Sequence, residues 1–469
     1  MTRAGVERNL RAVVERAAQH AASSGRPQWV VLRRDAGGRG AFDLFRDAGA
    51  EAERFFWARE GREVAASGAL LSIETRGAER FAAAAARCRA LREDIHLVGE
   101  DAQAEIDPLL VGGFGFADEA EASGIWNRFP ALSLVLPEVL VTRNGERSLL
   151  TTVRRIAANE DIDVACEGLL ADPTAARRGR NSLDATLATR ATERADGTED
   201  PEVAYRAQIE AALAAVNAGD LEKVVIARAV HLHSEERFAT EAILAHLRRS
   251  YPACTTFAVT RGRDTFLGAS PERLLRIEAG RVEATALAGS APRGDTPEED
   301  ARLARQLLES KKEQEEHAVV VRALREALEP TCSELDVPEA PRVARFEGIQ
   351  HLETPLAGEL AHNSTGASVL ELAARLHPSP AVAGAPRAAA LAWLERNEPL
   401  ERGWYAGGVG FVTPSGDGEL SVALRCALVR ETEASLFAGA GIVAGSQPDA
   451  ELAETRLKLQ ALLARMLGD

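Results

Sequence analysis

The sequence predicts an α+β fold that contains substantial antiparallel sheet. Helical and strand-like hydrophobic patterns are mixed along the 469 residues without the regular spacing of β–α–β units. The chain contains no internal repeat. A hydrophobic fraction of 46% supplies enough apolar material for a sizeable core.

A polar stretch divides the chain into two regions. Residues 173–201 are rich in charged residues and are punctuated by proline and glycine, so we interpret them as a linker or surface excursion. We therefore expect an N-terminal α/β region, residues 1–195, that contributes to a shared fold. The second region, residues 196–469, is denser in motifs and is expected to contain the functional site.

The first region contains one helical pattern and several strand patterns. Its N-terminus interleaves apolar and charged residues, which predicts an amphipathic helix and not a signal peptide. The apolar face comprises Leu10, Val13, Val14 and Ala17. Strands are predicted over residues 29–34 and 132–141, and a glycine-rich segment at 112–116 lies between them.

The second region begins with a predicted helix near Pro201, because proline is well placed in a first helical turn. Gly219 is a suitable residue to end this helix. Its apolar face comprises Tyr205, Ile209, Leu213 and Val216. Strands are predicted over residues 223–230 and 265–270.

Three further elements are predicted toward the C-terminus. Thr296 and Glu299 form a capping box, with Pro297 at the first helical position, and the helix should extend to about Leu328. Residues 435–443 are predicted to form a strand that enters a glycine turn. Residues 448–466 are predicted to form the closing helix.

The composition limits the partners and the compartment. A formal net charge of −15 argues against a nucleic-acid or anionic-membrane partner, and it means that an anionic substrate would need a local cation. No segment approaches the ~18 apolar residues of a membrane helix. The five cysteines are far apart and form no CxxC pair, which fits a reducing cytoplasm and offers neither a zinc site nor a disulfide framework. We therefore expect a cytoplasmic protein.

Two pairs of glutamates are candidate metal ligands. Glu313 and Glu316 are three residues apart, as are Glu451 and Glu454, so each pair lies on one face of its helix. Two such faces together would form an oxygen-rich site for Mg²⁺, which one or two carboxylates, waters and substrate oxygens usually hold. The alternative is that these glutamates belong to solvated helix faces.

Lys223 and Glu272 are candidate acid–base groups. Lys223 begins an apolar strand, where a desolvated lysine can lose its proton and serve as a base. The alternative is a lysine that reaches solvent from the strand entry. Glu272 follows a strand and a proline, and burial would make it a proton donor. The alternative is an exposed turn residue paired with Arg273.

Tyr405, Arg425 and two glycines are candidate anion-binding groups. Arg425 is predicted to lie in an alternating strand, where its guanidinium would need either a substrate carboxylate or a structural salt bridge. Gly439 and Gly441 superficially match a dinucleotide-binding turn, but the surrounding β–α–β unit and a later acidic residue are missing. We expect them to expose backbone N–H groups to an anion.

Nine blocks occur in order over roughly residues 200–465, which is more than half of the chain. They are KVVIARAV, FLGASPERL, ATALAGSAPRG, KKEQEEH, QHLETPLAGEL, LHPSPAVAGAP, RGWYAGGVGF, SVALRCALV and AGAGIVAGSQPDAELAETRLK. Together they resemble the chorismate-utilising enzymes, a family that includes isochorismate, salicylate, anthranilate and aminodeoxychorismate synthases. The resemblance implies two large antiparallel β-sheets flanked by helices, with residues 196–469 as the chorismate-binding catalytic region.

The resemblance also implies a set of site residues. Glu316 and Glu454 match magnesium ligands of the family, and Glu313 and Glu451 match carboxylates that act through water. His351 matches an active-site histidine beside the ring carboxylate. The residues that match the binding groups for the enolpyruvyl carboxylate are Tyr405, Arg425, Gly439 and Gly441. Mg²⁺ would thus be the cation that lets this acidic chain hold a dicarboxylate.

The choice of isochorismate synthase within the family depends on fewer residues. Lys223 matches a position where isochorismate and salicylate synthases have lysine, which would activate water for attack on C2 of the ring. Glu272 matches the acid that would protonate the departing C4 hydroxyl. Ala381 also fits isochorismate synthases, and the segment 112–141 resembles those of the menaquinone pathway.

Some parts of the chain depart from the family pattern. Gly408 replaces a common proline and Ala383 replaces a common glycine, which could change the loop near Tyr405. Residues 1–110 and 145–200 show no resemblance to the family.

Two other functions are compatible with the same residues. A salicylate synthase would also eliminate pyruvate in this site, and a non-catalytic chorismate-binding protein would have the site without turnover. Lys223 disfavours an anthranilate-type activity. We expect chorismate as substrate, a monomer and no glutaminase subunit. The product isochorismate would feed menaquinone, siderophore or salicylate-derived products.

Overall fold

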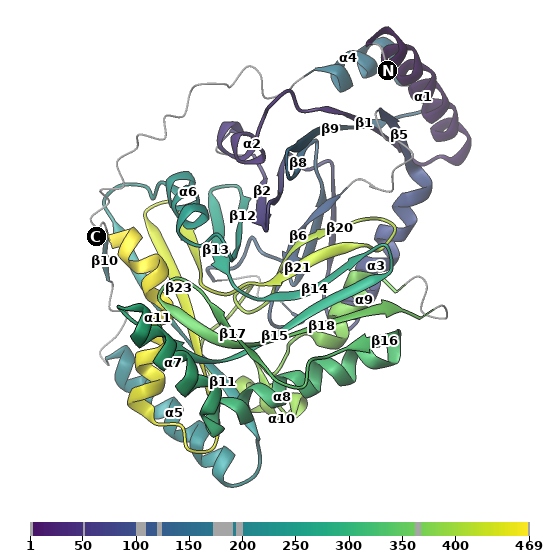
Figure 1. The fold of residues 1–469 in the computed structure, drawn as a ribbon. Helices are drawn as coiled ribbons and strands as arrows, with labels where there is room; N and C mark the ends of the chain where they lie inside the picture. The colour runs from purple at the N-terminus through teal and green to yellow at the C-terminus, as the bar shows by residue number, and fades with distance from the viewer. Residues whose placement is uncertain are drawn as a thin grey trace.

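The computed structural model describes residues 3–49, 52–99, 109–119, 124–171, 191–193, 200–361 and 367–467. Within these residues the chain folds into two large β-sheets with eleven α-helices around them (Figure 1). The predicted α+β fold is therefore confirmed, as are the two sheets that the family resemblance implied.

The first sheet has thirteen strands in the described part of the chain. Its strands are β1 Gln28–Asp35, β2 Arg54–Arg59, β3 Arg62–Ser67, β5 Ile95–Gly99, β8 Val139–Asn144, β9 Arg147–Ile156, β10 Ala191–Glu193, β11 Lys223–Ser234, β12 Thr255–Arg261, β13 Asp264–Ser270, β19 Gly384–Ala385, β22 Cys426–Arg430 and β23 Glu433–Ile442. Their spatial order is β10-β11-β23-β22-β13-β12-β2-β3-β8-β9-β1-β5, and β19 pairs with β11.

The second sheet has ten strands in the same described ranges. Its strands are β4 Leu71–Thr75, β6 Leu110–Phe114, β7 Leu132–Leu136, β14 Arg273–Glu278, β15 Arg281–Pro292, β16 Cys332–Asp336, β17 Arg342–Arg345, β18 Ile349–Leu360, β20 Gly408–Val412 and β21 Gly418–Val422. Their order is β16-β18-β15-β14-β21-β20-β6-β7-β4, with β17 beside β18. Among the described pairs of both sheets, β1–β5 is parallel and the others are antiparallel.

The helices pack around the sheets, and the predicted amphipathic faces point inward. They are α1 Arg3–Ser24, α2 Ala41–Asp47, α3 Arg80–Leu91, α4 Ile162–Leu170, α5 Pro201–Asn217, α6 Thr240–Ser250, α7 Pro297–Glu309, α8 Lys311–Leu328, α9 Val369–Leu376, α10 Arg387–Asn397 and α11 Pro448–Leu467, with 3₁₀ turns at Arg92–Asp94 and Glu329–Thr331. In α5, Tyr205, Ile209 and Val216 are buried and Leu213 is half-buried.

Strands from both halves of the chain build each sheet. In the first sheet β2 pairs with β12, and in the second β6 pairs with β20. In Figure 1 the purple and blue N-terminal strands continue the teal, green and yellow strands across the molecule. The core lies between the sheets, where Trp57 of β2 meets Phe411 of β20 edge to face, with ring centroids 5.2 Å apart.

Two buried tryptophans attach the N-terminal half to the loop before Tyr405. Trp126 Nε1 donates to the carbonyl of Glu401 at 3.2 Å, and Trp404 Nε1 donates to the carbonyl of Pro130 at 2.7 Å. Because both indole N–H groups have partners, the rings can be fully buried without an unpaired donor.

The predicted strand over residues 132–141 is two strands in different sheets. β7 belongs to the second sheet and β8 to the first, and Pro137 lies between them. Proline has no N–H to donate to a strand ladder, so the continuous apolar pattern is interrupted there. The hydrophobic pattern missed this break because both strands are buried.

The predicted helix over residues 296–328 is also divided. It ends at Glu309, and Ser310 takes an extended conformation and begins α8. The Ser310 side chain accepts a hydrogen bond from the N–H of Glu313 at 3.4 Å, which makes Ser310 the N-cap. Glu313 and Glu316 therefore lie in the first two turns of a helix and not in its middle.

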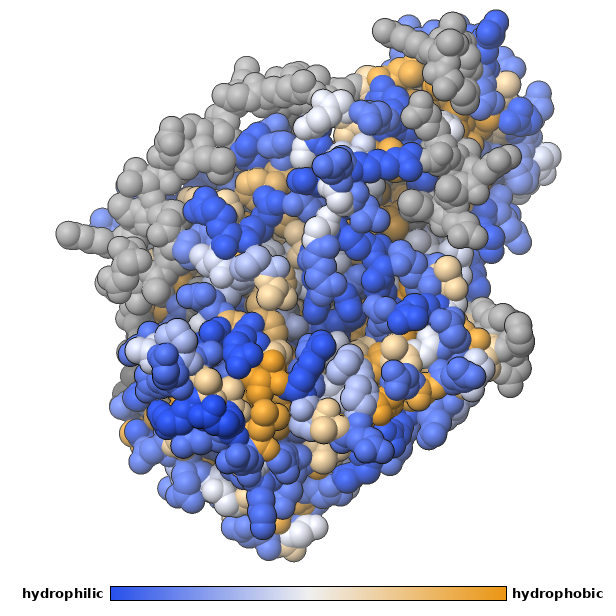
Figure 2. All heavy atoms as spheres, in the orientation of Figure 1, coloured by the Kyte–Doolittle hydropathy of each residue, from blue (hydrophilic) through white to orange (hydrophobic). Residues whose placement is uncertain are grey.

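The predicted linker lies mostly outside the described residues. Within it, β10 pairs with the end of β11. Figure 2 shows a mostly hydrophilic surface over the described residues of this face, with small separate apolar patches. No described helix is long and apolar enough to cross a membrane.

Candidate active site

One cavity brings together most of the side chains that the sequence suggested. Its empty volume is about 730 Å³, including the opening to solvent. The suggested residues that line it are Lys223, Glu272, Glu316, His351, Tyr405, Arg425, Gly439, Gly441 and Glu454. Ala381 also lines it, whereas Glu313 and Glu451 are not part of the lining.

Glu272 and Arg425 lie where the chain crosses between the sheets. Glu272 joins β13 in the first sheet to β14 in the second, and Arg425 joins β21 in the second sheet to β22 in the first. Because β13 pairs with β22 and β14 with β21, the two crossings are neighbours. The prediction that Arg425 lies within one alternating strand is therefore wrong: its φ is +47°, and the apolar pattern spans two strands.

Glu272 is a buried carboxyl group with an altered acidity. Its residue is 4% exposed, and burial raises the pKa of its side chain to about 8, although Lys223 and Lys458 act in the opposite direction. The interpretation of Glu272 as an exposed turn residue paired with Arg273 is therefore wrong. A carboxyl group in this state can donate a proton near neutral pH.

Lys223 is buried at the head of β11. Its side chain is 1% exposed, and Nζ lies 2.7 Å from Glu316 Oε1, so the alternative of a lysine in solvent is wrong. β23 passes beside this pair. A Cβ at Gly441 would lie 2.5 Å from Glu316 Oε1 and 2.8 Å from Lys223 Cε. The absence of a side chain at Gly441 thus leaves the room in which the pair forms.

The four glutamates come from the first two turns of α8 and α11. Burial raises the pKa of Glu313, and repulsion from Glu316 adds to it. Burial likewise raises the pKa of Glu451, with repulsion from Glu454. Lys312 Nζ of α8 lies 2.9 Å from Glu451 Oε1 of α11 and 3.5 Å from Glu313 Oε1 of its own helix. The alternative that these glutamates are solvated helix faces is wrong.

Lys458 is a site residue that the sequence reasoning missed. Its Nζ lies 2.8 Å from Glu454 Oε1 and donates to the carbonyl of Gly439 at 2.9 Å. Burial alone would raise the pKa of Glu454, but this contact and others lower it. The available signal was the spacing, because Lys458 is four residues after Glu454 and shares its helix face.

Arg425 and His351 form an unusual buried pair. Arg425 Nη2 donates to His351 Nε2 at 2.6 Å, and His351 Nδ1 donates to the carbonyl of Gly289 at 3.0 Å. Burial and the Arg425 charge lower the pKa of His351 to about 3, so the imidazole is neutral. Among the described residues no carboxylate lies within ion-pair distance of Arg425. The site therefore contains a buried cation that an anionic ligand could neutralise.

Tyr405 and the two glycines border the same side of the cavity. The Tyr405 ring stacks on Phe437 with centroids 5.3 Å apart. Gly439 and Gly441 lie inside β23 and pair with Ala227 and Val225, so the predicted glycine turn is wrong. β22 pairs with β23 only as far as Phe437, which leaves the edge beyond it without a second strand. Lys458 contacts that edge at the Gly439 carbonyl.

The four glutamates of α8 and α11 fit a divalent cation that is also bound by a ligand. Within the described ranges no group of three or more His, Cys, Asp or Glu side chains is arranged to hold a metal by itself. Glu316 and Glu454 both line the cavity, however, and Mg²⁺ commonly uses only one or two carboxylates with waters and substrate oxygens. The repulsion within the group of four glutamates would be relieved by an added positive charge.

The comparisons with known proteins identify the class to which this site belongs. The profile of the family described as chorismate binding enzymes matches residues 16–467, and the chain belongs to this family. The protein is therefore an enzyme of the kind that the nine sequence blocks indicated. The match also includes residues 16–110 and 145–200, so the interpretation that these segments show no resemblance to the family is wrong.

Similar proteins include two bacterial relatives and one solved structure. The salicylate biosynthesis isochorismate synthase of Pseudomonas aeruginosa is 37% identical over 87% of this chain and 83% of its own length. Isochorismate synthase MenF of Bacillus subtilis is 30% identical over 89% of this chain and 88% of its own. The crystal structure of a putative 2,3-dihydroxybenzoate-specific isochorismate synthase, DhbC from Bacillus anthracis, has a TM-score of 0.71 and 31% identity, covering 92% of this chain and all of that one.

The burial of Glu272 predicts a specific pH dependence of stability. Its pKa is about 8 in the folded protein and about 4.3 in an unfolded chain. Between these values the folded state retains a proton that the unfolded state has lost, so this group lowers stability as pH rises. Glu272→Gln should remove the effect and gain stability relative to wild type by a few kcal/mol, in order of magnitude, between pH 5.5 and 8.5.

Chemical denaturation of both proteins at several pH values measures this difference. Glu278→Gln is the matched control, because the Glu278 side chain is 55% exposed. Parallel stability curves for wild type and Glu272→Gln would contradict the assignment of a buried, protonated carboxyl group.

Proposed function

We propose that the protein is an isochorismate synthase, which adds water to C2 of chorismate and removes the C4 hydroxyl group. The observation that best supports this proposal is that one cavity contains a buried lysine, Lys223, and a buried carboxyl group of raised pKa, Glu272. Isochorismate formation needs both a base for water and an acid for the leaving hydroxyl. The relatives named as isochorismate synthases favour the same reaction.

The binding groups suit a substrate with two carboxylates. Arg425, buried without a carboxylate partner in the described part of the chain, would bind the enolpyruvyl carboxylate together with the hydroxyl of Tyr405. The N–H groups of Gly439 and Gly441 are candidates for further donors, because their strand edge lies beyond β22. His351 Nε2 accepts a hydrogen bond from Arg425, and the other ring nitrogen, Nδ1, lies 3.1 Å from Ser290 Oγ.

The residues that would hold Mg²⁺ are Glu316 and Glu454, with Glu313 and Glu451 acting through water. The cation would supply the positive charge that a ring carboxylate needs beside so many glutamates. Lys312 of α8 contacts Glu451 of α11, so this ion pair links the two ligand-bearing turns.

The proposed chemistry balances without a redox cofactor. Lys223 accepts a proton from water as the water oxygen bonds to C2, and the C1–C2 and C5–C6 double bonds shift to C1–C6 and C4–C5. The C4–O bond breaks as the C4–C5 double bond forms, and Glu272 gives its proton to the departing hydroxyl to form water. One water enters and one leaves, so the product is an isomer of the substrate. A positioned base and acid each contribute about 10²–10⁴-fold in typical enzymes.

The first test is to identify the products from chorismate. We expect the purified protein with Mg²⁺ at neutral pH to produce isochorismate reversibly, without ammonia or a second subunit. Removal of divalent ions with EDTA should abolish turnover, because the four glutamates then lack the positive charge that balances them, and added Mg²⁺ should restore turnover. Chromatography of the products measures both effects. Stoichiometric release of pyruvate would instead indicate a salicylate synthase, and no conversion by folded, Mg²⁺-saturated protein would indicate a binding protein.

The second test removes the proposed base. Lys223→Ala should lower kcat by about 10²–10⁴-fold, because water would lose its proton acceptor. Lys311→Ala is the matched control, since Lys311 is an exposed lysine on the same helix as Glu316 and should leave kcat unchanged. Near-wild-type turnover by Lys223→Ala would rule out the role given to Lys223.

A further inference from the structure

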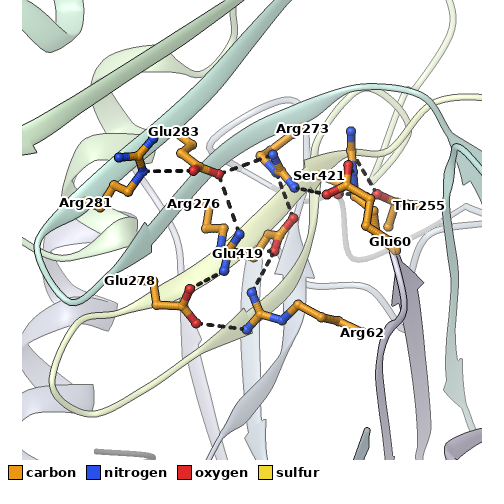
Figure 3. A network of polar contacts seen from close by, with 11 residues as sticks. Glu60, Arg62, Thr255, Arg273, Arg276, Glu278, Arg281, Glu283, Glu419 and Ser421 are labelled. Carbon is orange, nitrogen blue, oxygen red and sulfur yellow. Dashed lines mark hydrogen bonds and ion pairs between the residues drawn. The ribbon is translucent and has the colours of Figure 1, made fainter. Parts of the chain in front are cut away.

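A buried polar network begins at the residue next to Glu272. Arg273 Nε donates to Glu419 Oε1 at 2.9 Å, Nη2 lies 3.2 Å from Glu60 Oε2, and Nη1 lies 3.5 Å from Glu283 Oε2. Figure 3 shows the Arg273 side chain directed at these carboxylates. The Glu419 side chain is 1% exposed, so the Arg273–Glu419 contact is the innermost part of the network.

The network joins the two sheets. Glu60 lies in the turn between β2 and β3, and Arg62 of β3 contacts both Glu419 at 3.6 Å and Glu278 at 3.4 Å. Beside it, Thr255 of β12 shares a hydrogen bond of 2.9 Å with Ser421 of β21 (Figure 3). Arg62 and Thr255 belong to strands of the first sheet and Glu60 to a turn between two of them, whereas Arg273, Glu419 and Ser421 belong to the second.

The backbone of Glu272 is hydrogen-bonded to β21, the strand that contains Glu419. The Glu272 carbonyl accepts a hydrogen bond from Val422 N–H at 3.1 Å, at the end of the strand that contains Glu419. Arg273 pairs with Ser421 and Leu275 with Leu420, so the register shifts between these pairs. Such a bulge changes the direction of the strand at its start, next to the site. The Arg273 side chain connects this irregular turn of the chain to Glu419 of β21 and to Glu60 of the β2–β3 turn.

We propose that Arg273 is a positioning residue, and that the buried Arg273–Glu419 pair sets where Glu272 lies relative to Lys223. Lys223 belongs to β11 of the first sheet, whereas Glu272 lies on the crossing into the second. Any change in how the sheets meet at Arg273 therefore changes the separation of acid and base. This inference rests on the proposed function, because it takes Glu272 as the general acid.

The outer part of the network provides a matched control. Glu278 contacts Arg62 and Arg276, and its side chain is 55% exposed. Arg273 contacts Glu419, Glu60 and Glu283 but not Glu278 among the described ion pairs. Glu278→Gln thus alters the network without removing a partner of Arg273, whereas Glu419→Gln removes the innermost partner.

The test compares Glu419→Gln, Arg273→Lys and Glu278→Gln with wild type in chorismate turnover. We expect Glu419→Gln and Arg273→Lys to lower kcat roughly tenfold to a hundredfold, since a small misplacement of a catalytic group has effects of that size. KM should change less than about threefold, because Arg425 and Tyr405 are untouched. The alkaline limb of the kcat–pH profile should move to lower pH, as a less firmly held Glu272 gains solvent. Glu278→Gln should change neither quantity.

Two results would overturn the proposal: unchanged kcat and pH limb in folded Glu419→Gln, or an equal effect in Glu278→Gln. If Glu419→Gln does not fold, Glu60→Gln decides, because the Glu60 side chain is 57% exposed. It should lower kcat severalfold with the same pH shift, and an unchanged kcat would contradict the proposal.

A readout without substrate separates this inference from the proposed function. The pH range over which Glu272→Gln alters the free energy of unfolding should move to lower pH when Glu419→Gln is also present. Failure of wild type to convert chorismate would refute the function, and an unmoved range would refute the positioning role.

Discussion

The repulsion among four buried or half-buried carboxylates is the constraint on which the arrangement of the site depends. Glu313 and Glu316 lie in the first two turns of α8, and Glu451 and Glu454 lie in those of α11. Two lysines offset this charge, since Lys312 contacts Glu451 and Glu313 and Lys458 contacts Glu454, and Lys223 contacts Glu316. The positive ends of the helix dipoles act in the same direction. The cavity is thus lined both by carboxylates, Glu316 and Glu454, and by the buried cation of Arg425.

The crossing of the chain between the two sheets supplies the other half of the site. A sheet face alone presents side chains in regular alternation. At the crossings after β13 and β21 the chain leaves that pattern, and Glu272 and Arg425 can turn into the cavity. Burial then gives Glu272 its raised pKa and keeps His351 neutral. The positions of Glu272 and Arg425 in the cavity thus follow from the two places where the chain passes from one sheet to the other.

Sequence patterns predicted those features of the fold that depend on neighbouring residues, such as the buried face of a helix or the course of a strand. The face of α5 was predicted because Tyr205 and Ile209 repeat with the helical period, and the buried strand that begins at Lys223 was predicted because its apolar run is unbroken. The resemblance to the family brought distant residues such as Glu316 and Glu454 into one site, which periodicity cannot do. Ser310 shows a signal that was available but overlooked, since Ser310 and Glu313 match a capping sequence inside the presumed long helix.

Other features depend on tertiary contacts that no local pattern contains. Arg425 was predicted to lie in one strand because the apolar residues before and after it have the same period. These residues belong to strands of different sheets, which the period does not reveal. Gly439 and Gly441 have ordinary strand pairing, and the need for glycine arises from the close approach of Tyr405, Glu316 and Lys223. The role of Arg273 requires knowledge that Glu60, Glu283 and Glu419 converge from three separate strands or turns.

The origin of the new hydroxyl group tests the central claim most directly. Chorismate incubated with the protein and Mg²⁺ in H₂¹⁸O should give isochorismate that contains one ¹⁸O atom, because the oxygen at C2 comes from water and the C4 oxygen leaves. Mass spectrometry of the separated product measures this label. Unlabelled isochorismate would contradict water addition by Lys223 and Glu272, and the appearance of salicylate with stoichiometric pyruvate would contradict the assignment as an isochorismate synthase.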